Sequence, residues 1–150
     1  MPVDAKVDFD EGPPRRIDVE LFIIHPTMVP ADISAALGLE ARVAHCVGDQ
    51  RKPPKGTPLE GQHRDTRWRH CIRYEVTDQW FAEKIALLVD RLMPHKEFLG
   101  RVRATGGTAS LIVQFLGDGY HGDSVPVDTL KKLVELQLDF DIECFSVPQS

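Results

Sequence analysis

The chain has 150 residues and a formal net charge of −5, and 42% of its residues are hydrophobic. This length suits one domain that folds without a disulfide or metal staple, and the acidic balance argues against nucleic acid or an anionic membrane surface as a partner. No apolar run approaches the roughly 18 residues of a membrane-spanning helix. Residues 1–16 carry acids and lack the apolar core of a signal peptide, so we expect a cytoplasmic protein.

Alternating apolar and polar residues predict strands, and apolar residues at helical spacing predict helices. Strands are expected at 17–24, 41–47, 68–76, 109–116 and 139–145. Helices are expected within 29–40, 79–93, 95–104 and 125–137. Asp78 is the expected N-cap of the second helix, and Gly38 is the expected stop of the first. In the last strand Phe140, Ile142 and Cys144 alternate with acids, which predicts that Cys144 is buried and inert.

The order of these elements is strand, helix, strand, strand, helix, helix, strand, helix, strand. We therefore predict an α+β fold, with a mostly antiparallel, ferredoxin-like sheet, helices on one face and an added helix–strand unit. Residues 1–16 are expected to form a polar N-terminal arm, and residues 17–150 a single domain. The cysteines, Cys46, Cys71 and Cys144, form no C-x-x-C pair, so neither a zinc ribbon nor a redox motif is predicted.

The segment "QFLGDGYHGDSVP" has the G-x-G-x-x-G spacing of a dinucleotide-binding loop between a predicted strand and a predicted helix. Asp118 and Asp123 would repel a phosphate, and the helix begins only near Pro126. Only about 30 residues follow, too few for a second nucleotide-binding half. The alternating last strand also differs from the doubly buried strands of a parallel sheet. We therefore interpret this segment as a glycine-rich turn and predict no cofactor.

Asp118, His121 and Asp123 offer oxygen and imidazole ligands for a cation in the same loop. Their spacing does not match an EF-hand, and no H-E-x-x-H supplies a zinc site. We predict no metal, and we keep these three residues as candidate binding residues. No G-x-S-x-G motif is present and the cysteines lie in predicted strands, so no catalytic residue is predicted either.

A basic segment runs from Gly48 to Arg69, with six cationic and three acidic side chains and a local balance of +3. Arg64, Arg67, Trp68 and Arg69 are its candidate binding residues, because arginines beside an aromatic can hold an anion or an acidic protein surface. The other interpretation places Trp68 in the core and leaves a solvated loop. Residues 115–150 carry seven acids and two lysines, and this acidic surface could meet a basic partner or the basic segment of a second copy.

The sequence resembles a group of small, mostly bacterial proteins catalogued as domain of unknown function 4279. The resemblance is carried by "PADISAALGL", Gly48, Trp68, "ALLVDRLMPHKEFLGRV" and "LKKLVELQLDFDIECF". It covers nearly the whole chain, from about Ile17 to Phe145. It implies a fold but no mechanism, so no catalytic residue is carried over.

These observations lead to two functional hypotheses. The first is a non-catalytic, protein-binding or regulatory module that engages another protein through the basic segment or the acidic surface. The alternative is a small-molecule or anion-binding domain, perhaps a hydrolase, that uses the 117–124 loop together with the basic 48–69 segment. A homodimer is a further expectation, because an exposed edge strand could pair two copies.

Overall fold

The computed structural model describes residues 15–51, 61–76, 80–117 and 120–145. These residues form five strands and four α-helices. The strands are β1 (Arg15–His25), β2 (Val43–His45), β3 (Thr66–Val76), β4 (Thr108–Leu116) and β5 (Asp139–Phe145). The helices are α1 (Pro30–Leu37), α2 (Ala82–Leu92), α3 (Lys96–Ala104) and α4 (Val127–Glu135), with a single 3₁₀ turn at Met93–His95 between α2 and α3. None of the described helices is long and apolar enough to cross a membrane.

The strands form one sheet in the order β2-β3-β1-β4-β5. The central strand β1 pairs antiparallel with both β3 and β4, and β2 pairs antiparallel with β3. β5 pairs parallel with β4, and α4 connects the two strands. The α+β prediction is therefore confirmed, but the sheet is mixed rather than antiparallel throughout. The ferredoxin-like classification stays a prediction.

The parallel pairing was not expected, because β5 alternates polar and apolar residues. Doubly buried parallel strands are apolar throughout, whereas β5 lies at the edge of a sheet that helices cover on one face only. Phe140, Ile142 and Cys144 do share the face of the core strand residues, as predicted. The prediction that Cys144 is buried is wrong: Cys144 is exposed, and Ile142 keeps 59% of its surface exposed.

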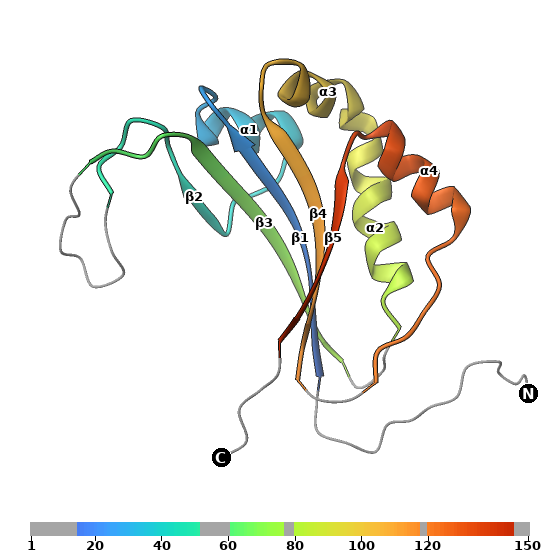
Figure 1. Cartoon of the computed structure of the whole chain (residues 1–150). Helices are drawn as coiled ribbons and strands as arrows, with labels where there is room; N and C mark the ends of the chain where they lie inside the picture. The colour runs from blue at the N-terminus through green and yellow to red at the C-terminus, as the bar shows by residue number, and fades with distance from the viewer. Residues whose placement is uncertain (1–14, 52–60, 77–79, 118–119, 146–150) are drawn as a thin grey trace, which may run out of the picture.

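All four helices lie on one face of the sheet (Figure 1). Alternate residues of β1 point into this layer and are fully buried: Ile17, Val19, Leu21 and Ile23. They form one core with Ile33 of α1, Leu88 of α2, Leu99 of α3 and Leu133 of α4. α1 ends as predicted at Gly38, whose φ of 65° is the left-handed conformation that glycine tolerates best.

The end of β1 is held by His25, a buried imidazole whose two nitrogens are both occupied. Its Nδ1 accepts hydrogen bonds from the backbone N–H groups of Thr27 (3.0 Å) and Met28 (2.9 Å). Its Nε2 therefore carries the proton and lies 2.7 Å from Oγ1 of Thr105. Gly107 allows this fit, because a Cβ there would lie 2.7 Å from the imidazole Cδ2. Burial lowers the pKa of His25 below its ordinary value.

We predict that acid destabilises the protein in part through His25. Because the folded-state pKa is lowered, the unfolded chain takes up the proton first, so stability falls as the pH drops below about 6.5. Protonation of Nδ1 would also break two backbone hydrogen bonds. His25→Asn should lower the free energy of unfolding by about 1–2 kcal/mol at pH 7.5 and reduce its decline between pH 7.5 and 5.5. Urea unfolding across this pH range tests this, and an unchanged slope in the variant would contradict it.

Candidate functional site

Two short arms of the basic segment, 46–51 and 61–66, run side by side at the end of β2 and β3. The N–H of Gly48 donates to the carbonyl of His63 (2.9 Å), and the N–H of His63 donates to the carbonyl of Asp49 (2.9 Å). The N–H of Arg51 donates to the carbonyl of Gly61 (3.3 Å), and Gly48 and Gly61 both have positive φ. This backbone ladder fixes the side chains at the base of the segment.

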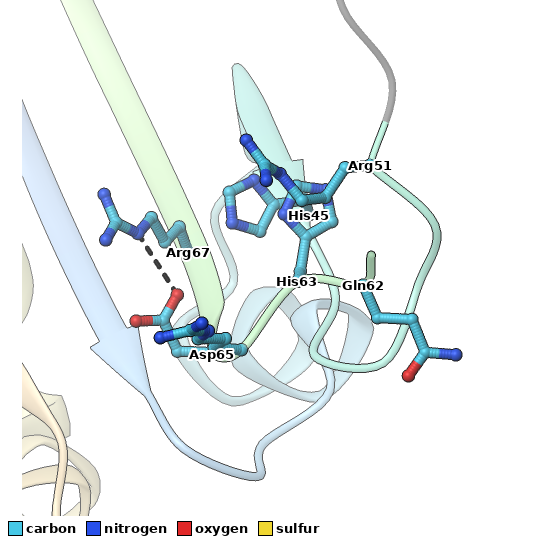
Figure 2. Close-up of a pocket in the computed structure, with 7 residues that line it drawn as sticks. His45, Arg51, Gln62, His63, Asp65 and Arg67 are labelled. Carbon is cyan, nitrogen blue, oxygen red and sulfur yellow. Dashed lines mark hydrogen bonds and ion pairs between the residues drawn. The ribbon is translucent and has the colours of Figure 1, made fainter. Parts of the chain in front are cut away.

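The backbone hydrogen bonds bring two imidazole rings into stacking contact, His45 from β2 and His63 from the returning arm. Their ring centroids lie 3.6 Å apart and their planes differ by 9°. They border a solvent-open hollow of about 430 Å³, with Arg51 beside the rings and Arg67 paired with Asp65 below them (Figure 2). Arg64 and Gln62 complete the lining. We call this set of seven residues the basic hollow.

The charges of the basic hollow act on His45. Burial lowers its pKa below the ordinary value, and the charges of His63 and Arg67 lower it further. Asp65 and Asp49 act in the opposite direction and do not outweigh these effects. The His45 imidazole is therefore neutral at pH 7.5 and gains a proton more readily when an anion lies beside it.

The basic hollow continues into the face of the sheet that no helix covers. Arg67 and Arg69 alternate along β3 on this face, and the guanidinium of Arg69 lies 4.0 Å from the ring centre of Phe22. Arg69 also pairs with Glu20 at 3.0 Å. Glu20 is only 4% exposed, so solvent meets the guanidinium rather than the carboxylate.

Asp18 is the second buried acid on this face, with 2% of its surface exposed. Arg73 contacts both of its oxygens, at 3.3 and 3.4 Å, and Arg16 lies 3.4 Å from one of them. Arg42 reaches both acids, at 4.0 Å from Asp18 and 3.9 Å from Glu20. These four arginines keep between 33% and 48% of their side chains exposed. A guanidinium has five N–H donors, so donors remain for a ligand.

The structure places the four candidate residues of the basic segment in three different environments. Arg64 and Arg67 line the basic hollow, and Arg69 lies on the adjoining sheet face. Trp68 is fully buried and donates its indole N–H to Oγ of Ser34 (2.9 Å), so it belongs to the core. Sequence reasoning missed His45, Arg51 and His63. A signal for the two histidines was present, because His45 comes directly before the first arm and His63 lies within the second.

The 117–124 loop does not share this site. His25 pairs with Thr66 at one end of β1, and Arg16 pairs with Leu116 at the other. The two loops are therefore about 30 Å apart, at roughly 3.3 Å per strand residue. Asp118 lies outside the described residues. His121 packs on the ring of Phe115, with centroids 4.6 Å apart.

Asp123 has a structural role in this loop. Its Oδ2 accepts hydrogen bonds from the backbone N–H groups of Phe81 (3.1 Å) and Ala82 (2.9 Å) at the start of α2. Its Oδ1 accepts from the N–H of Ser124 (2.8 Å). A carboxylate at this position also favours the positive end of the helix dipole. Asp123 therefore caps the start of α2 from a position far along the chain. Asp78, the expected N-cap, lies outside the described residues.

We predict that Asp123→Ala lowers the free energy of unfolding by about 1–2 kcal/mol, the usual effect of removing an N-cap. Asp128→Ala is the matched control, because Asp128 is exposed and, among the described residues, pairs with Lys132 four positions along the same helix. That control should change stability by less than about 0.5 kcal/mol. Urea denaturation compares the two, and equal stability of both variants would show that Asp123 does not cap α2.

The environment of Cys71 makes its thiol a weak nucleophile. Burial and the nearby Asp18 raise the pKa of the Cys71 thiol, which keeps it protonated and poorly nucleophilic at neutral pH. Cys71 faces Arg42 on the uncovered side of the sheet, whereas His70 faces the opposite side and contacts the carbonyl of Glu40 at 2.7 Å. Within the described ranges, no group of three or more His, Cys, Asp or Glu side chains is arranged to hold a metal ion.

Comparison with known proteins identifies the family of the chain. Residues 15–145 match the family described as Domain of unknown function (DUF4279), so the chain belongs to this family, as its resemblance predicted. No curated protein matches the chain. No solved structure matches it either.

Proposed function

For this member of the DUF4279 family, we propose a non-catalytic role as a binding module whose basic hollow takes the carboxylates of an acidic protein segment. The observation that carries the proposal is the stacked His45–His63 pair with Arg51, Arg64 and Arg67 around one open hollow. Arginine is suited to carboxylates, because its planar fork can donate two parallel hydrogen bonds to them. The stacked imidazoles add donors that gain charge when an anion approaches.

The shape of the surface favours an extended partner over an enclosed small molecule. Small-molecule sites are mostly apolar and enclose their ligand. The basic hollow is lined by charged and polar side chains and is open, and it leads through Arg67 to Arg69, Arg42 and Arg73 on the sheet face. Successive carboxylates of one acidic segment could follow this row of guanidinium groups.

The alternative hypothesis, a small-molecule site or hydrolase built from both loops, has less support. The 117–124 loop lies at the opposite end of β1, and Asp123 is engaged at the start of α2. An anion site in the basic hollow alone is a narrower form of this alternative. Titration with inorganic phosphate, run in parallel with the titration of the acidic peptide, tests this narrower alternative.

We predict that a fluorescein-labelled oligoglutamate peptide binds the wild-type protein and that the Arg64→Gln, Arg67→Gln double variant binds it about tenfold more weakly. The matched control is Arg91→Gln, Arg101→Gln, which removes the same charge from α2 and α3 on the covered side. Arg69 is left unchanged because it holds Glu20. Fluorescence anisotropy at fixed ionic strength measures both. Equal affinity of the two double variants, or no binding by the wild-type protein, would contradict the proposal.

Binding should also strengthen as the pH falls from 7.5 to 6.0. The lowered pKa leaves His45 neutral at the higher pH, and the carboxylates of a bound peptide favour its protonation as the pH falls. Glutamate, with an ordinary pKa of about 4.3, stays charged throughout this range. His45→Asn should reduce the pH dependence, and an unchanged dependence in that variant would exclude His45 from the site.

A further inference from the structure

The outer edge of β5 is open in the part of the chain that the structure describes. β5 is the last strand of the sheet, and its only described strand partner is β4. Its seven residues therefore present one row of backbone groups to solvent. Such an edge can accept an added strand, whose alternate side chains then point to the two faces of the sheet.

An apolar pocket lies beside this edge on the helix-covered face. Its volume is about 380 Å³, and it is lined by Phe81, Phe115 and His121 on one side and by Ile142 and Cys144 of β5 on the other. The rings of Phe81 and Phe115 meet edge to face with centroids 5.0 Å apart, so one wall is an ordered aromatic pair. Ile142 is 59% exposed there, which leaves apolar surface for a partner side chain.

The neighbouring helix α4 extends the apolar flank. Lys132 on one side of α4 pairs with Asp90 of α2 at 3.0 Å. Val127, Leu130 and Val134 lie on the opposite side of the helix, turned away from α2, and are exposed. These exposed apolar side chains add to the apolar surface on the helix-covered side of the sheet.

The other face of β5 is acidic. Asp139, Asp141 and Glu143 alternate with the apolar residues and point to the uncovered side of the sheet. Asp139 lies 3.5 Å from Arg103, and Glu143 accepts a hydrogen bond from the amide of Gln114 (2.7 Å). Asp141, between them, is exposed. A strand added here meets carboxylates on one face and the apolar pocket on the other.

We propose that β5 is a docking edge for an extended peptide of alternating basic and apolar residues. The peptide pairs with the outer edge of β5, its basic side chains lie beside Asp141 and Glu143, and one apolar side chain fills the pocket at Ile142. Charge complementarity selects this occupant over a second copy of the chain. In an antiparallel β5–β5 pair, Asp141 of one copy would lie near Glu143 of the other, and like charges on facing strands repel.

The test uses a labelled peptide as long as β5, Lys-Val-Lys-Phe-Lys-Val-Lys, and fluorescence anisotropy. Two control peptides are compared with it: one of the same composition with its lysines grouped, and one with glutamate in place of each lysine. We expect the alternating lysine peptide to bind about tenfold more tightly than either control. Asp141→Lys should reverse the preference between the lysine and glutamate peptides. Replacing the phenylalanine of the peptide by alanine should weaken its binding to the wild-type protein severalfold. The same replacement should weaken binding to the Ile142→Ser variant by a smaller factor.

Circular dichroism first establishes that both variants are folded, as their exposed positions lead us to expect. Equal binding of the alternating and grouped peptides would overturn the proposal, because charge attraction alone would then explain the binding of both peptides. An unchanged preference in Asp141→Lys would overturn it as well. A wild-type dimer in sedimentation that Ile142→Ser converts to monomer would assign the edge to a second copy instead. These outcomes are independent of the oligoglutamate experiment, which concerns the opposite edge of the sheet, at β2 and β3.

Discussion

Two carboxylates on the central strand, Asp18 and Glu20, determine how the uncovered side of the sheet is built. Burying an unpaired charge is strongly unfavourable, so each acid needs cationic partners across the neighbouring strands. Arg16 and Arg73 meet Asp18, and Arg69 meets Glu20. The aliphatic parts of the arginines cover the strands while their guanidinium groups remain hydrated. The sheet can therefore leave this face without a helical layer.

This arrangement divides the uncovered face by charge. β3 and the adjoining basic hollow present guanidinium groups above buried acids, whereas β5 presents exposed carboxylates at the far edge. The strand order β2-β3-β1-β4-β5 keeps the two regions apart, with β1 and β4 between them. The same separation places the glycine-rich loop and the basic segment at opposite ends of β1. The two surfaces therefore carry opposite charge and lie apart, so the two partners proposed for them would not compete for one site.

Local patterns predicted most of the elements, because strand alternation, helical spacing and Gly38 act over a few residues. What they could not predict depends on register between distant strands. The burial of Asp18 follows from pairing β1 with β3, which brings Arg73 beside it. The stacking of His45 on His63 depends on the ladder between two arms, and the cap that Asp123 provides joins residues 41 positions apart. The antiparallel expectation for β5, which was one of the reasons given against a nucleotide site at 117–122, was wrong, because β5 pairs parallel with β4.

Buried carboxylates organise the uncovered face, and the stability of Asp18→Asn tests their role most directly. Asp18→Asn removes the carboxylate that Arg73 and Arg16 contact among the described residues while preserving the size of the side chain. We predict that the free energy of unfolding falls by about 2 kcal/mol. This loss is smaller than that for breaking a fully buried ion pair, because the arginines are partly exposed to solvent. Asp141→Asn, at an exposed position on the same face, should change it by less than about 0.5 kcal/mol. Equal effects of the two substitutions in urea unfolding would contradict the account.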